Sequence, residues 1–282
     1  MLTMFTVPKP FNGHIGLIQT NAIQSWLLIH PELEVLLLGN EEGTAEAASR
    51  FGIRQIPDIE CNEYGTPLVS SAFSVAQQAA KYQIMCYVNA DIILTSDFIP
   101  AIQRVNLESF MVLGQRLDLE LKETIDFNDA YWESWLRNRL AESGKLHPAT
   151  GIDYFIFLRG LYTDIPPFAI GRTSWDNWLV YRARSLKIPV IDATKAITAI
   201  HQNHDYSHHP EEKAGVWAGA EAQRNRKLAG GYNHVFNIRD ATIVLTAEGI
   251  KKISTARIIE RHCKRLARAF FSSTLAALRR LG

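Results

Sequence analysis

Short apolar runs and segments of helical spacing alternate along roughly the first hundred residues. The apolar runs have the length of strands and cover residues 2–7, 34–38, 53–56 and 84–88. Between them, apolar side chains recur at helical spacing over residues 15–29, 44–50 and 69–81. Because strands that alternate with helices build parallel sheets, this pattern predicts an α/β fold with a doubly wound, mostly parallel sheet.

The second half of the chain continues with further helices and strands. We expect helices over residues 97–105, 125–140 and 174–185, and strands over residues 110–113, 152–158 and 189–191. No internal repeat or low-complexity linker interrupts the sequence, so residues 1–235 are expected to form one domain. Residues 236–282 are expected to form a basic amphipathic extension with a helical tail.

The central feature is the stretch over residues 82–98, in which an apolar strand runs into Asn89-Ala90-Asp91. In open α/β sheets, ligands bind at the carboxyl ends of the strands. Asp91 is therefore placed to hold a hard divalent cation, which prefers oxygen ligands, against a diphosphate. The alternative is that Asn89 and Asp91 turn the chain or cap the helix that follows.

Composition favours a globular protein from a reducing compartment. The chain has 282 residues, of which 47% are hydrophobic and 21% are charged, and its three cysteines lie far apart in the sequence. Neither a disulfide framework nor a cysteine metal site is indicated by this number and spacing. The N-terminal residues lack a basic segment followed by a cleavage site, so we expect no signal peptide and a cytoplasmic location.

Positive charge is concentrated at the end of the chain. The formal net charge is +1, but residues 251–282 carry nine basic side chains against Glu260 alone, which leaves the preceding residues at −7. Over residues 254–281, the spacing predicts a helix with one apolar and one basic stripe, which can contact a membrane surface peripherally. The alternatives are that this helix docks on the acidic body or on another protomer. We expect no nucleic-acid binding, because the acidic body has no aromatic–basic patch.

The chain contains neither G-x-G-x-x-G after its first strand nor G-x-x-x-x-G-K-[ST], which disfavours dinucleotide-binding and P-loop proteins. The alternating first half and the motifs VNADIIL, GIDYFIF, GRTSWDNWLV and AIHQNHDY instead resemble the nucleotide-sugar-dependent glycosyltransferases of the GT-A fold, such as those of glycosyltransferase family 2. The resemblance covers roughly residues 1–210 in layout. It implies a nucleotide-sugar donor, a saccharide or other hydroxyl acceptor, and Mn²⁺ or Mg²⁺ on the donor diphosphate.

The resemblance also implies which residues bind the donor. Asp91 and His201 would hold the metal ion, since imidazole at a strand end can complete such a site. The first acid of the usual metal motif is replaced here by Asn89, and we expect this neutral amide to contact the nucleotide ribose. Further contacts to the base and ribose would come from residues after the first two strands, namely Thr6, Val7, Pro8, Asn40 and Glu41.

Two acidic residues in the second half are candidate catalytic groups. Asp176, in the first turn of a predicted helix, would take the proton from the acceptor hydroxyl in an inverting transfer. Acidic residues also stabilise helix starts, and the flanking Trp175 and Trp178 suit either a sugar ring or the core. Asp153 precedes an apolar run and is an acceptor-binding or second-choice catalytic residue, unless an internal donor such as Arg159 satisfies it.

Two other functions remain open from the sequence. One is a nucleotidyltransferase of related fold, which the lack of a Gly-rich, Arg-containing loop after the first strand disfavours. The other is a non-catalytic nucleotide-sugar-binding or scaffold protein, which Asn89 favours. A cluster of Asp91, Asp153, Asp176 and His201 in the folded chain would favour the enzyme.

Overall fold

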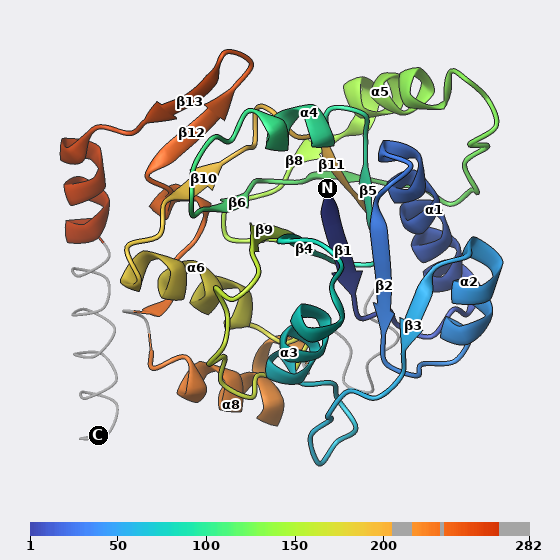
Figure 1. Ribbon diagram of the computed structural model, residues 1–282, viewed down its shortest axis with the longest axis horizontal. Helices are drawn as coiled ribbons and strands as arrows, with labels where there is room; N and C mark the ends of the chain where they lie inside the picture. The colour runs from blue at the N-terminus through green and yellow to red at the C-terminus, as the bar shows by residue number, and fades with distance from the viewer. Residues whose placement is uncertain (205–215, 232–233, 265–282) are drawn as a thin grey trace.

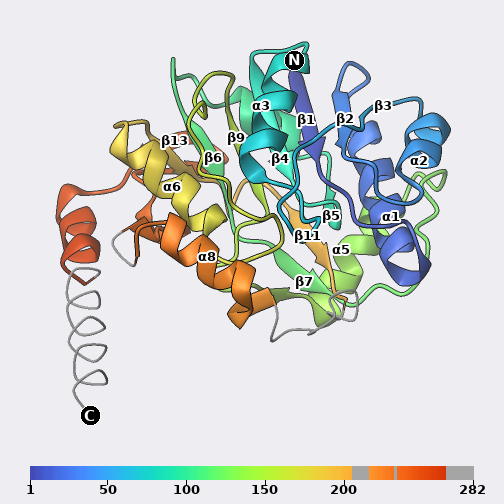
Figure 2. The same cartoon turned by 90° about the horizontal axis from the view of Figure 1, so that it is seen from below.

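The computed structural model describes residues 1–204, 216–231 and 234–264, which form two β-sheets flanked by helices (Figure 1, Figure 2). The strands of the larger sheet, from edge to edge, are β13 (Gly249–Lys252), β12 (Ile243–Thr246), β10 (Val190–Asp192), β6 (Met111–Leu113), β9 (Tyr154–Leu158), β4 (Ile84–Val88), β1 (Leu2–Thr6), β2 (Glu34–Leu38) and β3 (Arg54–Ile56). The strands of the smaller sheet, in order, are β5 (Ile92–Leu94), β11 (Ala199–Gln202), β7 (Leu117–Leu119) and β8 (Lys145–Leu146).

Most neighbouring strands of the larger sheet run parallel. β1 lies between β2 and β4 and is parallel to both, and β3, β6, β10 and β12 also have parallel neighbours. β9 is antiparallel to β4 and β6, and β13 is antiparallel to β12. The predicted α/β class with a mostly parallel sheet is confirmed. The direction of β9 was not predicted, because an apolar run reads the same in either direction.

Helices cover both faces of the larger sheet (Figure 1). The helices of one face are α1 (Gly13–Ile29), α2 (Thr44–Phe51) and α4 (Phe98–Gln103). The helices of the other face are α3 (Val69–Ala79), α6 (Trp175–Ser185) and α8 (Ala220–Leu228). Trp26 of α1 and Phe73 of α3 are fully buried in the two resulting cores. This cover on both faces explains why the central strands are apolar at nearly every position.

The helix expected at residues 125–140 begins later than predicted, since α5 spans Trp132–Ser143. The side chains of Asp126 and Asp129 each accept the backbone N–H of the residue two positions further on. Such turns hold the backbone outside helical geometry. The prediction was therefore wrong over residues 125–131.

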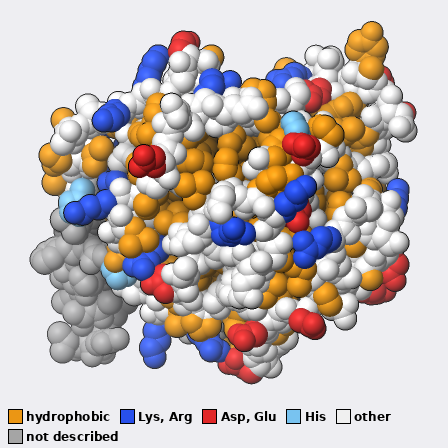
Figure 3. All heavy atoms as spheres, viewed as in Figure 1, with side chains coloured by type: hydrophobic (Ala, Val, Ile, Leu, Met, Phe, Trp, Pro, Cys, Tyr) orange, Lys and Arg blue, Asp and Glu red, His pale blue; other side chains and the backbone are white. Residues whose placement is uncertain are grey.

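The chain beyond residue 235 adds to the larger sheet. β12 and β13 form a hairpin next to β10, which the sequence pattern did not predict, and a helix over residues 255–264 follows at the periphery (Figure 2). The division of the chain at residue 235 remains a prediction, and residues 265–282 of the expected amphipathic tail lie outside the described residues. Over the described ranges, no helix combines the length and the apolar composition that a bilayer-spanning segment needs. Acidic and basic side chains are interspersed on the face seen in Figure 3.

Trp26 connects α1 to the strand that follows Asp91. Its Nε1 atom donates a hydrogen bond of 2.8 Å to the carbonyl oxygen of Ile92. We predict that Trp26→Phe lowers the free energy of unfolding by about 1–3 kcal/mol, because a buried carbonyl loses a donor. Urea unfolding measures this change. Leu28→Ala is the control, since Leu28 lies exposed on the same helix, and a loss no larger than that of the control would contradict the prediction.

Candidate functional site

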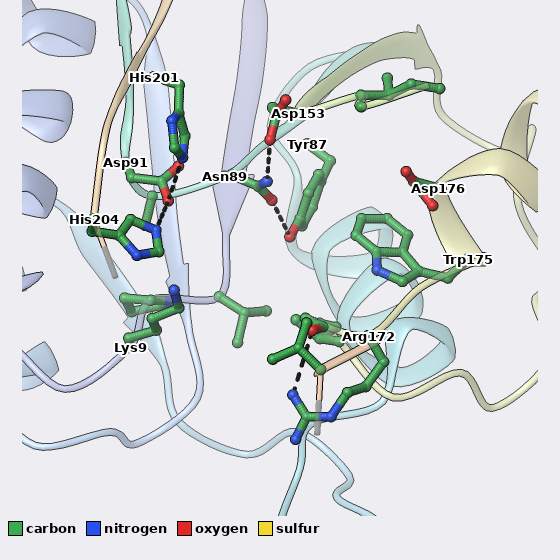
Figure 4. A pocket seen from close by; sticks show the side chains of 18 of the residues that line it. Lys9, Tyr87, Asn89, Asp91, Asp153, Arg172, Trp175, Asp176, His201 and His204 are labelled. Atoms are coloured by element: carbon green, nitrogen blue, oxygen red, sulfur yellow. Dashed lines mark hydrogen bonds and ion pairs between the residues drawn. The ribbon is translucent and has the colours of Figure 1, made fainter. Parts of the chain in front are cut away.

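A cavity of about 460 Å³ opens at the carboxyl edge of the larger sheet. β1 and β4 run parallel, so the segments that follow them, residues 7–10 and 89–91, meet at this edge. The start of α6 and the end of β11 supply further walls (Figure 4). The cavity therefore lies where open α/β sheets bind their ligands.

Asp91, His201 and His204 lie together on one wall of this cavity (Figure 4). Each offers one ligand atom, and these atoms lie within 4.8 Å of one another. The Nε2 atoms of His204 and His201 lie 3.1 Å and 3.8 Å from Oδ2 of Asp91. The Oδ1 atom of Asp91 is buried and has no hydrogen-bond partner among the described residues. Two imidazoles and a carboxylate with an unused oxygen are a donor set that fits a divalent cation.

The smaller sheet brings this cluster together. Asp91 directly precedes β5, and Ile92 of β5 is paired with His201 of β11. The backbone N–H and the side-chain amide of Gln202 both donate to the carbonyl oxygen of Asp91, at 3.3 Å and 3.1 Å. Strand pairing therefore fixes the backbone of Asp91 beside the predicted histidine ligand.

Neighbouring charges keep the Asp91 carboxyl ionised despite its burial. Burial alone would raise the pKa of Asp91, but His201, His204 and Lys9 outweigh it and hold that pKa well below its usual range. Burial lowers the pKa of His201, whereas Asp91 and Asp118 raise it, and the net shift is upward. The pKa of Lys9 is lowered, chiefly by burial. The wall thus combines an ionised carboxylate with basic side chains that face the cavity.

A hydrogen-bonded network connects Asn89 to Asp153. The Nδ2 atom of Asn89 donates to Oδ1 of Asp153 at 2.8 Å, and the Tyr87 hydroxyl donates to Oδ1 of Asn89 at 3.0 Å. Arg116 Nη1 also donates to Oδ1 of Asp153, at 2.6 Å. Asp153 thus has internal donors, Asn89 and Arg116, and the prediction of Arg159 as the donor was wrong. Arg159 follows the far end of β9 and donates to a backbone carbonyl there.

Asp176 faces the same cavity from the first turn of α6 (Figure 4). Its side chain is half-buried, and burial, with a smaller contribution from the charge of Asp153, raises its pKa to about 7. Trp175 and Trp178 belong to the buried core between α6 and the larger sheet, and Trp175 also lines the cavity. The structure therefore brings together the four residues that the sequence singled out as a diagnostic cluster.

The remaining predicted contacts divide between the cavity wall and other positions. Val7, Pro8 and Glu41 line the cavity. Thr6 is fully buried at the end of β1 and Asn40 is exposed, and neither is among the lining residues. The roles assigned to all these residues in nucleotide binding remain predictions.

Sequence reasoning missed several residues of the site. Lys9 and Arg172 line the cavity. Lys9 lies outside all of the quoted motifs, and Arg172 belongs to GRTSWDNWLV, where only Asp176 and its flanking tryptophans stand out as candidates. His204 belongs to the same motif as the predicted histidine ligand. Nothing in the sequence distinguishes it from His208 and His209, which lie outside the described residues.

No family model matches this chain, and neither does any curated protein. Among solved structures, it is similar to a protein from Desulfovibrio desulfuricans G20 described as a nucleotide-diphospho-sugar transferase, with a TM-score of 0.46, 9% identity, and coverage of 80% of this chain and 95% of that one. Glucosyl-3-phosphoglycerate synthase from Mycobacterium tuberculosis, solved with Mg²⁺ and uridine diphosphate, gives a TM-score of 0.45 at 16% identity, covering 82% and 80%. A mannosyltransferase from Pyrobaculum calidifontis, solved with GDP-Man and Mn²⁺, gives 0.44 at 14%, covering 71% and 56%.

The chain resembles nucleotide-sugar glycosyltransferases. At these identities and scores the likeness concerns overall shape, and the chemistry proposed below rests on the geometry of the site.

The raised pKa of Asp176 predicts a pH-dependent change in stability. Folding raises this pKa from 3.8 to about 7, so the protonated carboxyl favours the native state, and stability falls as the pH rises through that range. We predict that Asp176→Asn raises the free energy of unfolding by about 1–4 kcal/mol near pH 9 and leaves it unchanged near pH 3.

Urea unfolding at the two pH values measures this difference, with Glu142→Gln as the control because Glu142 is an exposed acid. An equal change at both pH values would show that the effect does not come from the ionised carboxyl.

Proposed function

We propose that this protein transfers a sugar from a nucleotide-diphosphate-sugar to a hydroxyl acceptor with the assistance of Mn²⁺. The observation that carries the proposal is the arrangement of one cavity. The Asp91, His201 and His204 cluster lies on one wall, and Asp176, a carboxyl with a pKa of about 7, lies across from it (Figure 4). A cation site and a proton acceptor that face one space suit an inverting sugar transfer, in which one stabilises the leaving diphosphate and the other takes the acceptor proton.

The residues of the cluster suit Mn²⁺ better than Mg²⁺. Mg²⁺ prefers oxygen ligands in octahedral geometry, whereas a site with two imidazoles favours a transition metal. Asp91 Oδ1, which is buried without a partner among the described residues, is available as the carboxylate ligand. When bound, the metal ion would supply positive charge to the diphosphate of the donor.

Side chains of this chain carry out the proton transfer and help to stabilise the leaving group. The acceptor oxygen forms a bond to the anomeric carbon, and the bond from that carbon to the diphosphate breaks, with the electron pair leaving on the diphosphate. Asp176 takes the proton of the acceptor hydroxyl, because a base with a pKa near neutrality is suited to that step. Lys9, which lies at the cavity beside Asp91, offsets the charge that develops on the leaving group.

Residues on the remaining wall can position the two substrates. Val7, Pro8 and Glu41 follow the first two strands and would contact the nucleoside. Asp153 also lines the cavity, and its Oδ2 atom is buried without a partner among the described residues. A buried carboxylate oxygen of this kind is satisfied by a donor such as a sugar hydroxyl. We therefore assign Asp153 to sugar binding and Asp176 to proton transfer.

Ligand-induced stabilisation tests the donor site. We predict that UDP, GDP or CDP raises the melting temperature and that Mn²⁺ enlarges the increase more than Mg²⁺ does, since ligands of the folded state stabilise it by mass action. Asp91→Ala should abolish the part that depends on the metal, whereas Glu46→Ala, at an exposed position of α2, should retain it. The absence of any nucleotide-induced shift would contradict the proposal. If the nucleotide raises the melting temperature equally with and without metal, donor binding stands and the role of Mn²⁺ is rejected.

The pH dependence of turnover tests the role of Asp176. Release of nucleoside diphosphate from the donor should slow by about tenfold per pH unit below about pH 7, because the base must be ionised. Asp176→Asn should lower kcat by about 10²- to 10⁴-fold while the nucleotide-induced stabilisation remains. A variant that retains wild-type kcat would assign the proton transfer to another group.

A further inference from the structure

Asp118 lies on the side of the His201 ring away from the metal cluster. β11 lies between β5 and β7, and the strand register pairs His201 directly with Asp118. The Nδ1 atom of His201 lies 3.4 Å from Oδ1 of Asp118, and its Nε2 atom lies 3.8 Å from Oδ2 of Asp91. The two nitrogens of one imidazole thus face two carboxylates, Asp118 in β7 and Asp91 directly before β5.

Asp118 is itself held by two further side chains. Arg116 Nε donates to its Oδ1 atom at 2.8 Å, and His147 Nδ1 lies 2.7 Å from its Oδ2 atom. Arg116, His147 and His201 line the cavity, whereas Asp118 is not among the lining residues. Asp118 is therefore a rigid carboxylate behind the wall, placed to act on a ligand through the residues in front of it.

We propose that Asp118 is a positioning residue for the metal site. It accepts the Nδ1–H of His201 and thereby leaves the Nε2 lone pair directed towards the metal ion beside Asp91. A neutral imidazole carries one N–H, and a carboxylate at Nδ1 selects the tautomer whose Nε2 can bind a cation. The same contact fixes the orientation of the ring and raises the basicity of the ligand atom. This inference rests on the metal site of the proposed function.

Asn203 is the competing partner for the same nitrogen. Its Oδ1 atom forms a hydrogen bond of 3.3 Å with Nδ1 of His201, whereas Asp118 Oδ1 lies at the ion-pair distance of 3.4 Å. A hydrogen bond to a charged carboxylate is stronger than one to a neutral amide, and Asp118 is held in place by two other residues. We therefore assign the orienting role to Asp118, and the experiment includes a variant of Asn203.

The experiment is a titration of the 282-residue protein with Mn²⁺, in which the EPR signal of the free ion gives the Kd. Asp118→Asn keeps the size of the side chain but removes its charge, and its amide can donate to Nδ1 and select the wrong tautomer. We expect this variant to bind Mn²⁺ about 10- to 100-fold more weakly than the wild type. Glu120→Gln removes an exposed carboxylate just beyond β7, and it should change the Kd by less than about threefold, as should Asn203→Ala.

A second measurement does not require the Asp118 variant to fold. ¹⁵N NMR of the metal-free wild-type protein, above the pH at which its imidazoles titrate, reports which nitrogen of His201 carries the proton. His201→Gln identifies the signal. We expect the Nδ1–H form, and a predominant Nε2–H form would overturn the proposal.

The outcomes separate this inference from the function on which it rests. An unchanged Kd in Asp118→Asn, or an equal loss in Asn203→Ala, would overturn the positioning role and leave the metal-assisted transferase intact. If Mn²⁺ does not bind the wild-type protein, or binds Asp91→Ala equally well, both the metal site and its positioning residue are rejected. Nucleotide-induced stabilisation then reports separately on donor binding.

Discussion

The largely buried carboxylate of Asp91 is the charge that the structure around the cavity must accommodate. An ionised group removed from water is costly unless it is paired and hydrogen-bonded. His201, His204 and Lys9 together lower the pKa of this carboxyl, and they come from two distant parts of the chain. The carboxylate at the end of β4 is therefore stabilised by the segment after β1 and by the end of β11 together.

Asn89 shows how the same requirement shapes the neighbouring position. Its amide donates to Asp153 and accepts from Tyr87, so both of its polar ends are in use. An aspartate there could not donate, and it would place a second carboxylate next to that of Asp153, which raises the pKa of one of them. The amide thus connects two acidic parts of the site without adding charge, and the two histidines provide the other metal-ligand atoms beside Asp91.

The sequence predicts those parts of the site that depend on local pattern. Asp91 follows an apolar strand, His201 lies in another strand, and Asp176 is in the first turn of a helix, so the position of each could be inferred from its own segment. The Arg116–Asp118 pair could not be inferred, because its partners depend on the register of strands only three or four residues long. Similarly, the hairpin of β12 and β13 owes its place to pairing with β10, which no local pattern encodes.

The central claim is that Asp91, His201 and His204 together bind a manganese ion in the cavity that Asp176 faces. The most direct test is a crystal grown with Mn²⁺ and UDP, with diffraction data collected where manganese scatters anomalously. The account predicts one anomalous peak at bonding distance from the Asp91 carboxylate and both imidazoles, next to the diphosphate. A nucleotide in the cavity with no anomalous peak at these three side chains would contradict it.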